Sequence, residues 1–253
     1  MIARSHEHIF LCLINKTITT TLYPIVYFCY TKRIFMKLIA SIAAIITMMS
    51  CNHDPKPLNE PTAMLDPVEM SYQDGMSRAY FASGCFWCVE AVFESVKGVD
   101  EVISGYSGGK EDNPTYKQVS YGNTTHAEAV EVIYNPQVIS YKQLVDVFFG
   151  SQDPTTKNRQ GPDAGPQYRS IAFYQNDSEK KIIDATIEAL NESTYNGKIS
   201  TQVLPFQKFW IAEDYHQDYE KNNPNNPYIK NVSIPRYRRF AQKFPELLKE
   251  GAH

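Results

Sequence analysis

Residues 79–96 read AYFASGCFWCVEAVFESV, and this stretch contains a change from strand to helix. Its first four residues predict a short strand, and the Ser-Gly pair that follows ends it. Apolar residues then recur at helical spacing from Val89 to Val96. The pattern therefore predicts a helix whose N-terminus lies at or near Cys85.

Two cysteines, Cys85 and Cys88, stand at this predicted helix N-terminus. A thiol there faces unpaired backbone N–H groups and the positive end of the helix dipole, which lower its pKa from about 8.5. Cys85 is therefore predicted to be a nucleophilic thiolate. Residues i and i+3 lie roughly 5 to 6 Å apart, so Cys88 is predicted to be within reach of a sulfur species on Cys85. Such a pair is redox-active, metal-binding or incidental.

Residues 36–50 have the anatomy of a secretory signal, with one positive charge after Met36, a short apolar run and Ser50 before Cys51. The apolar run is shorter than the ~20 residues that a membrane-spanning helix needs. A signal ending in Ser-Cys-Asn resembles a bacterial lipoprotein signal, in which the cysteine carries the lipid. This resemblance implies an exported protein, anchored through Cys51 to a bacterial membrane and facing the periplasm or the cell exterior.

Residues 1–35 do not fit this anatomy, and the simplest interpretation is that they are an upstream extension absent from the mature protein. An unusual apolar anchor within them is the alternative, although polar residues interrupt it. Residues 51–77 contain four prolines among polar residues and are expected to form a flexible tether. The catalytic domain is then expected at 78–250, where Cys85 and Cys88 are the only cysteines.

The composition is that of an ordinary globular protein. The chain has 253 residues, 43% of them hydrophobic, and a formal net charge of -3. The 25 basic residues against 28 acidic ones provide no basic footprint for nucleic acid. Aromatic residues reach 13%, which suits either a packed core or an aromatic-walled pocket.

The remaining periodicity predicts an α+β fold, a two-layer sandwich of helices on a mainly antiparallel sheet, with a ferredoxin-like core and an irregular C-terminal region. Ser140 and Gln143 form a capping box before one helix. The other predicted strands are 101–106, 127–134, 169–174 and 201–212, and the other predicted helices are 178–191 and 240–249.

Four further motif stretches lie downstream of the cysteines. Residues 105–109 read GYSGG and 113–116 read NPTY, residues 122–130 read GNTTHAEAV, and residues 160–170 read QGPDAGPQYRS. Together with GCFW at 84–87, these motifs resemble the peptide methionine sulfoxide reductase A family. The resemblance covers about residues 78–220.

The resemblance implies a division of labour in which a thiolate attacks the sulfoxide sulfur and a carboxylic acid protonates its oxygen. A sulfoxide is a poor electrophile until its oxygen is protonated, so a general acid is required. Apolar neighbours on the same strand face are expected to raise the pKa of that acid. The resemblance implies no catalytic role for His126. It also implies no metal and no bound cofactor. The implied residues are the nucleophile Cys85, the acid Glu128, the oxygen-site residues Tyr116, Asp163 and Tyr168, and the S-methyl-binding residues Phe86 and Trp87.

The sequence departs from the commonest family pattern at two places. Cys88 stands where many members have a small residue, and no recycling cysteine follows it. Family chemistry then implies a Cys85 sulfenic acid, a Cys85–Cys88 disulfide, and its reduction by thioredoxin or another dithiol. The resemblance also implies selectivity for the S epimer of methionine sulfoxide, free or in proteins.

Two other classes compete with this interpretation. A thioredoxin-type thiol-disulfide oxidoreductase also carries C-x-x-C after a strand, but it leaves Glu128 and Tyr168 without a role. A metal-binding or adhesive surface lipoprotein is the second alternative, but structural zinc needs four ligands and this region offers one cysteine pair.

Overall fold

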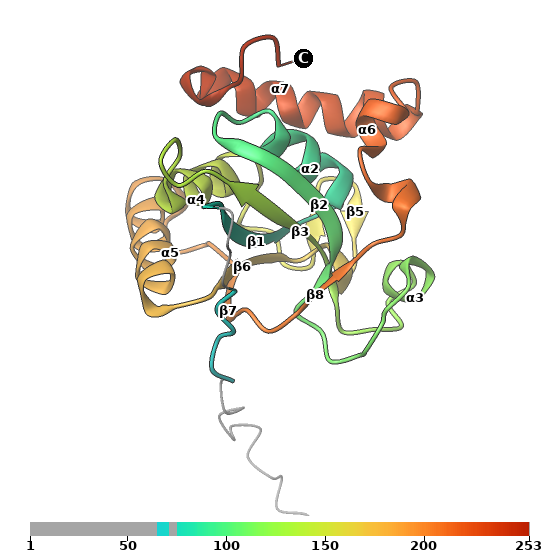
Figure 1. The fold of residues 1–253 in the computed structure, drawn as a ribbon, viewed down its shortest axis with the longest axis horizontal. Helices are drawn as coiled ribbons and strands as arrows, with labels where there is room; N and C mark the ends of the chain where they lie inside the picture. The colour runs from blue at the N-terminus through green and yellow to red at the C-terminus, as the bar shows by residue number, and fades with distance from the viewer. Residues whose placement is uncertain (1–64, 71–74, 253) are drawn as a thin grey trace, which may run out of the picture. The chain divides into compact units, whose positions relative to one another are not determined.

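The computed structural model describes residues 65–70 and 75–252, which form a mixed α/β domain built on a six-stranded sheet (Figure 1). The strand order is β7-β6-β1-β3-β2-β8, and every pairing is antiparallel except β6 with β7. The strands are β1 (Ser77–Ser83), β2 (Val99–Ser107), β3 (Ala127–Tyr134), β6 (Ser170–Tyr174), β7 (Gln202–Pro205) and β8 (Phe209–Ile211), with a separate hairpin of β4 (Arg159–Gln160) and β5 (Asp163–Ala164). The α-helices are α2 (Phe86–Glu94), α3 (Tyr116–Ser120), α4 (Tyr141–Gly150), α5 (Asp177–Leu190), α6 (Tyr219–Asn222) and α7 (Ile234–Lys243), and the other helical turns are η1 (Pro166–Tyr168), η2 (Asn191–Tyr195), η3 (Asp214–His216), η4 (Ile229–Ser233) and η5 (Pro245–Leu247).

The change from β1 to α2 occurs where the sequence predicts it. Gly84 has φ +83°, a left-handed conformation that L side chains rarely adopt. A Cβ atom at this position would also lie 2.6 Å from the Gln160 side chain. The glycine lets the chain turn sharply, so Cys85 becomes the N-cap residue of α2.

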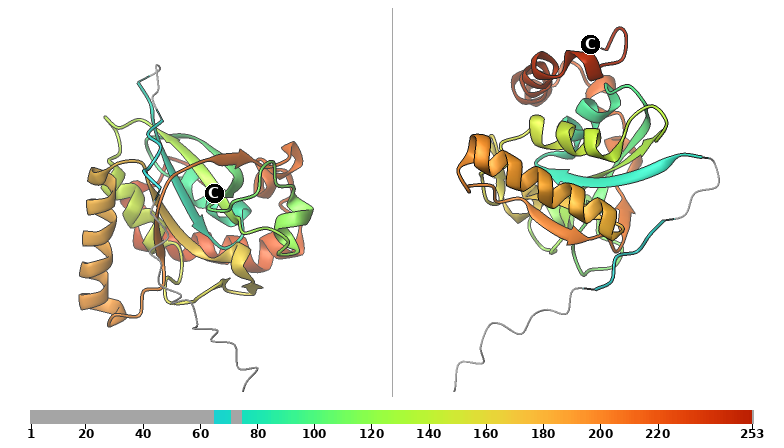
Figure 2. Two further views of the ribbon diagram at one scale, coloured as in Figure 1. Left: turned by 90° about the horizontal axis from the view of Figure 1, so that it is seen from below. Right: turned by 90° about the vertical axis from the view of Figure 1, so that its left-hand side faces the viewer.

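Helices α2 and α4 pack on one face of the sheet, α7 packs against these two helices, and α5 runs beside the β6–β7 edge (Figures 1 and 2). Phe81 of β1 stacks on Phe93 of α2 and on Phe148 of α4, with ring centroids 5.2 and 5.0 Å apart. The Ser140 capping box opens α4 as predicted. The α+β architecture with helices on a mainly antiparallel sheet is therefore confirmed.

The prediction of one strand over 201–212 is wrong, because this segment forms two strands at opposite edges of the sheet. β7 pairs with β6, and β8 pairs with β2. The residues between them cover the second face, where the Phe206 ring stacks on Tyr80 at 3.7 Å. Pro205 lies in edge strand β7, as expected for a residue without an N–H donor.

The closing helix also differs from the prediction of 240–249. It is α7, which begins at Ile234 and ends at Lys243. Pro235 occupies the first turn, where its missing N–H costs nothing, and Pro245 stands two residues after the last helical residue. The shift matters because it brings Arg236 into a helix that packs against α2.

Phe206 is expected to be a major contributor to stability, since it is 2% exposed and closes the second face. Phe206→Ala should lower the free energy of unfolding by about 3–5 kcal/mol. Tyr121 is 74% exposed, so Tyr121→Ala should change it by less than about 0.5 kcal/mol. Urea denaturation of both variants measures the difference, and equal midpoints would contradict this account of the second face.

The predicted signal segment, the upstream extension and Cys51 lie outside the described residues. Within the expected tether, Val68 N–H donates to Phe206 O at 2.8 Å, so this part is held against the domain. None of the helices in 65–70 and 75–252 is long and apolar enough to cross a bilayer.

Candidate active site

The two thiols lie together at the start of α2. Cys85 is 6% exposed and Cys88 is 2% exposed, and both are free thiols. The Cys88 N–H donates to Cys85 O at 3.2 Å, which closes the first turn. The two thiols lie close enough for each to shift the pKa of the other. The prediction that Cys88 can reach a species on Cys85 is therefore confirmed.

The helix dipole predicts a lowered pKa for Cys85, but in the structure the pKa of Cys88 is lowered and that of Cys85 is raised. Burial raises the pKa of Cys85 well above its usual range, and Cys88, Glu128 and Asp163 raise it further. The hydrogen bond from Cys85 lowers the pKa of Cys88 to about 7 despite its burial, and Arg236 contributes to the lowering. Desolvation therefore outweighs the dipole at Cys85, and Cys88 is the thiol of the pair with the lower pKa.

Glu128 contacts the same helix N-terminus from strand β3. Its Oε2 accepts a hydrogen bond from the Phe86 N–H at 3.1 Å, and the residue is 2% exposed. Burial raises the pKa of Glu128 to about 8, and the charges of Asp163 and Cys88 add to the effect. The sequence-based expectation of a raised pKa is thus confirmed, and this carboxyl is mostly protonated at neutral pH.

Tyr116 and Tyr168 complete a polar group around the thiol and the acid. Tyr116 opens α3, and its backbone N–H donates to Glu213 Oε1 at 2.9 Å. Burial raises the pKa of both phenols, and Glu128 and Cys85 are the next causes for each. Both hydroxyls therefore stay protonated and can donate hydrogen bonds.

Asp163 joins the group through a tyrosine that the sequence analysis did not single out. Its Oδ2 accepts a hydrogen bond from the Tyr228 hydroxyl at 2.5 Å. The same hydroxyl lies 3.7 Å from Cys88 Sγ, and Asp163 also acts on the pKa values of Cys85 and Glu128. All the residues implied for the oxygen site thus lie around one thiol.

Aromatic rings surround the first turn of α2. Trp87 stacks on Tyr219 at 3.7 Å and meets Tyr228 edge-on at 6.1 Å. Its indole N–H donates to His216 Nδ1 at 3.1 Å, which fixes the orientation of the ring. Phe86 is 1% exposed and lies with its ring centroid 5.0 Å from that of His216. Such a cage suits the methyl group of a thioether or sulfoxide.

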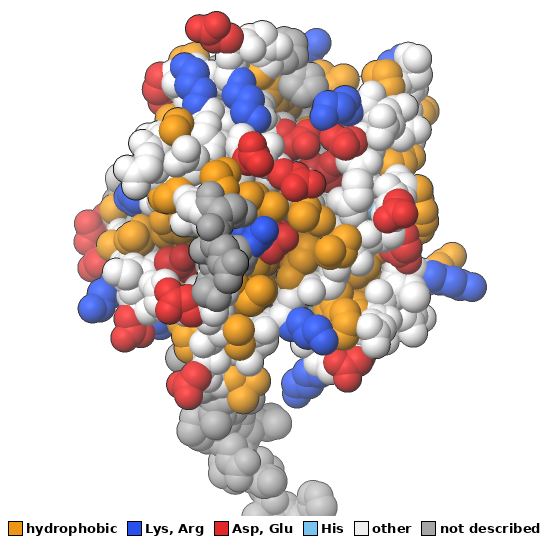
Figure 3. All heavy atoms as spheres, in the orientation of Figure 1, with side chains coloured by type: hydrophobic (Ala, Val, Ile, Leu, Met, Phe, Trp, Pro, Cys, Tyr) orange, Lys and Arg blue, Asp and Glu red, His pale blue; other side chains and the backbone are white. Residues whose placement is uncertain are grey.

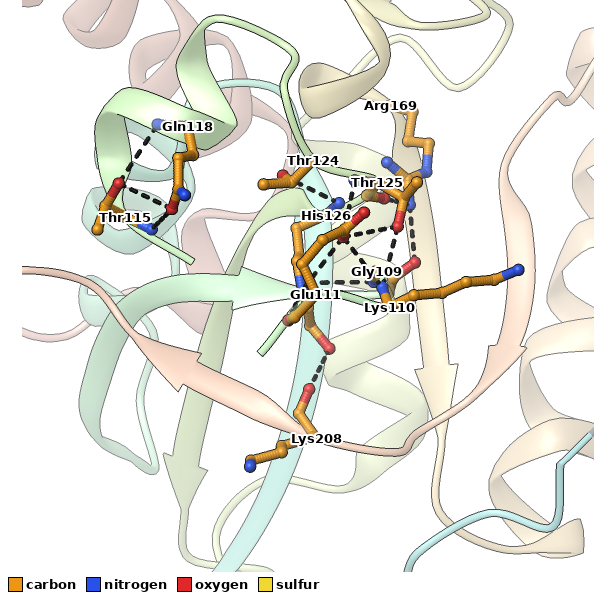
Figure 4. Close-up of polar contacts among 12 residues, drawn as sticks. Gly109, Lys110, Glu111, Thr115, Gln118, Thr124, Thr125, His126, Arg169 and Lys208 are labelled. Carbon is orange, nitrogen blue, oxygen red and sulfur yellow. Dashed lines mark hydrogen bonds and ion pairs between the residues drawn. The ribbon is translucent and has the colours of Figure 1, made fainter. Parts of the chain in front are cut away.

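The loop between β2 and β3 is held by a polar network around His126 (Figure 4). Its Nδ1 accepts from Gly109 N–H at 3.2 Å, and its Nε2 lies 2.8 Å from Glu111 O. The Glu111 carboxylate accepts from the backbone and the hydroxyl of Thr125, which lower the pKa of Glu111 to about 2. Arg169 donates to Gly108 O and Thr125 O. His126 therefore supports the loop that carries Tyr116.

The geometry of this site agrees with the comparison of the whole chain with known families. The profile described as peptide methionine sulfoxide reductase matches residues 77–248. The chain belongs to the peptide methionine sulfoxide reductase family. It is accordingly a reductase of methionine sulfoxide, and the thioredoxin-type and non-catalytic alternatives are set aside.

Individual relatives agree with the family assignment. A peptide methionine sulfoxide reductase A of Rhodopirellula baltica is 48% identical over 182 residues, which are 72% of this chain and 94% of that protein. One of Sulfolobus acidocaldarius is 47% identical over 68% of this chain and 97% of its own length. The reduced crystal structure of Mxr1 from Saccharomyces cerevisiae has a TM-score of 0.58 and 36% identity, covering 62% of this chain and 91% of that chain.

Several residues of this reductase site come from the C-terminal region that the sequence predicts only as irregular chain. His216, Tyr219 and Tyr228 line the aromatic cage, and Arg236 lies beside the thiols. The run EDYHQDY at 213–219 was the available signal, since aromatic and polar residues concentrated in a loop often mark function.

Acidic side chains gather on another face of the reductase, over α2 and β2 (Figure 3). Oxygen atoms of Glu90, Glu94 and Asp218 lie within 4.8 Å of one another there. The two oxygens of Glu90 already accept hydrogen bonds, from the Ser104 hydroxyl and the Asp218 N–H. These bonds tie α2 and β2 to the loop that carries His216, which is a structural role.

Proposed function

We propose that this protein reduces methionine S-sulfoxide, free or in proteins, with Cys85 as nucleophile and Glu128 as general acid. The observation that carries the proposal is that both groups meet at one helix N-terminus, where Glu128 accepts the Phe86 N–H at 3.1 Å. Phe86 and Trp87 hold the S-methyl group, and Tyr116, Tyr168 and Asp163 surround the oxygen. Protein repair after oxidative damage is the biological role that follows.

The protonation states define the first step. Cys85 passes its proton to the Cys88 thiolate as its sulfur attacks the sulfoxide sulfur, and Glu128 transfers its proton to the sulfoxide oxygen. Collapse of the adduct releases methionine and leaves a sulfenic acid on Cys85. The two electrons that reduce the sulfoxide come from the Cys85 sulfur.

Cys88 resolves the sulfenic acid. Its sulfur displaces the hydroxyl group, an S–S bond forms, and the departing hydroxyl group takes up the Cys88 proton and leaves as water. Since residues 89–252 contain no further cysteine, the described domain offers Cys88 alone for this step. A thioredoxin-like dithiol then reduces the Cys85–Cys88 disulfide, and no bound cofactor is needed.

NMR of a racemic methionine sulfoxide peptide, treated with the purified protein and dithiothreitol, tests the proposed function. Loss of the S epimer alone is the expected result. Consumption of the R epimer, or of neither, would refute the substrate assignment.

Cys88→Ser is expected to release about one methionine per enzyme and then stop with thioredoxin as reductant, because the sulfenic acid has no resolving thiol. The measurement is methionine released per enzyme in the absence and presence of thioredoxin and its reductase. Steady-state recycling at the wild-type rate would contradict the assignment of Cys88.

We also infer a ferredoxin-like core for the catalytic domain. The order of its central elements supports this, since β1, α2, β2, β3, α4 and β6 alternate as β-α-β-β-α-β. The four strands lie side by side in the order β6-β1-β3-β2.

We propose that the mature protein begins at Cys51, is lipid-anchored and acts outside the cytoplasm. The signal-like segment at 36–50 and its Ser-Cys-Asn end support this proposal. Metabolic labelling with a fatty acid should label the wild type but not Cys51→Ser. Equal labelling, or a native peptide from residues 1–35, would refute it.

A further inference from the structure

Arg236 of α7 is a buried cation that forms no direct ion pair within the described part of the chain, and Asp163 is the one carboxylate among the groups that act on it there. The residue is 6% exposed, and its guanidinium donates to Ser151 O, Ser83 O and Ser83 Oγ at 2.7 to 2.8 Å. All three acceptors are neutral. Within 65–70 and 75–252, no carboxylate forms an ion pair with it. Because a buried charge without a direct ion pair is costly, a further anion besides Asp163 is expected near this guanidinium.

The thiol pair is placed to supply that anion. Arg236 and Cys88 line the same cavity of about 150 Å³, together with Asp163 and Tyr228. Helix α2 packs against both α7 and η4, and Cys88 Sγ lies 3.7 Å from the hydroxyl of Tyr228, the residue before η4. The guanidinium is locked by three hydrogen bonds, so its charge has a fixed position beside this cavity.

The titratable groups around Cys88 come from several elements of the fold. Cys85 comes from the N-cap of α2, Glu128 from β3, Asp163 from β5, Tyr228 from the residue before η4, and Arg236 from α7. The carboxyl and phenol groups among them all have raised pKa values, chiefly through burial. Arg239 also lines the cavity but is exposed, so Arg236 is the buried cation beside Cys88, and Ser233 adds a hydrogen bond to Cys88.

We propose that Arg236 is a positioning residue that holds Cys88 as a thiolate, first as proton acceptor for Cys85 and then as attacking group on the Cys85 sulfenic acid. The proposal rests on the proposed function, in which Cys88 resolves Cys85. In the second step Cys88 releases the proton that it accepted from Cys85, and its thiolate forms the S–S bond as the S–O bond breaks. The departing hydroxide takes up that proton and leaves as water. Arg236 donates no proton, and its charge acts through Cys88.

The test measures the reactivity of Cys88 directly. In a Cys85→Ser background of the full chain, iodoacetamide labelling of the Cys88 peptide is followed by mass spectrometry from pH 5 to 10. Arg236→Gln should raise the pKa of Cys88 by one or more and slow its labelling at pH 7 by roughly tenfold. Arg236→Lys should restore most of the rate. Arg238, exposed on the same helix, gives the matched control Arg238→Gln, which should change nothing.

An unchanged Cys88 pKa in a folded Arg236→Gln variant would overturn the proposal. If the Gln variant does not fold, Arg236→Lys decides, since it loses the three-point hydrogen bonding but retains the charge. A Cys88 pKa near 7 then supports the proposal, and a value like that of a free thiol overturns it. With Cys85 present, a single turnover that yields methionine and the disulfide tests the proposed function separately, so the two failures are distinguishable.

Discussion

Replacing Cys85 with serine is expected to lower kcat/KM for a methionine sulfoxide peptide by roughly 10⁴-fold or more, since the whole first step depends on one sulfur atom. Serine fills nearly the same volume and can still donate a hydrogen bond to Cys88, so the variant should fold. Its hydroxyl is hardly ionised at neutral pH and is a poor nucleophile toward sulfur. Methionine release in a single turnover is the measurement, with thermal unfolding as the control for folding.

The same experiment decides which thiol attacks. Cys88 has the lower pKa, about 7, and on ionisation alone it would be the nucleophile. Cys85, however, is the cysteine that contributes to the raised pKa values of both Tyr116 and Tyr168, the phenols of the oxygen site. We therefore expect the first turnover to vanish in Cys85→Ser and to survive in Cys88→Ser, although more slowly because the proton acceptor for Cys85 is lost. The reverse pattern would assign the attack to Cys88.

Local sequence patterns predicted the parts of the fold that neighbouring residues determine. The Ser-Gly pair before Cys85, the capping box at Ser140 and the alternation from 127 to 134 each specify structure within one turn or strand. The segment 201–212 has a strand-like composition throughout, but its two halves pair with strands far away in the chain. No local pattern shows that β7 and β8 lie at opposite edges.

The sequence predicted the site residues that lie within compact motifs. It did not predict the single residues from distant segments that also line the site. Tyr228 lies in a stretch rich in Asn and Pro, and Arg236 lies in an ordinary basic helix. Their roles depend on contacts across more than 60 residues, such as that of Tyr228 with Asp163. The predicted direction of the Cys85 pKa shift differs from that in the structure for a related reason. The sequence shows the helix N-terminus, which lowers the pKa, but not the burial, which raises it more.

Glu128→Gln is expected to lower the rate of the first step by roughly 10² to 10⁴-fold, the usual contribution of a general acid. Glutamine can still accept the Phe86 N–H, so the helix N-terminus should keep its geometry while the transferable proton is lost. The pH profile carries the sharper test. Glu128 acts in its protonated form, so the wild-type rate should fall as the pH rises above about 8, whereas the variant should lack this decline.

At high pH, Glu128→Gln should increase the stability of the protein, although it lowers the rate of the first step. A carboxyl group whose pKa is raised on folding binds more protons in the folded state than in the unfolded state between pH about 4.3 and about 8. The free energy of unfolding of the wild type therefore falls across this window. As the pH rises, the unfolded protein releases this proton easily, whereas the folded protein keeps it or must ionise a buried carboxyl group. Glutamine does not titrate, so Glu128→Gln should gain stability relative to the wild type between pH 5 and pH 9. Parallel urea-denaturation curves across that range would show that Glu128 is ionised in the resting enzyme, and the site would then need another proton donor for the sulfoxide oxygen.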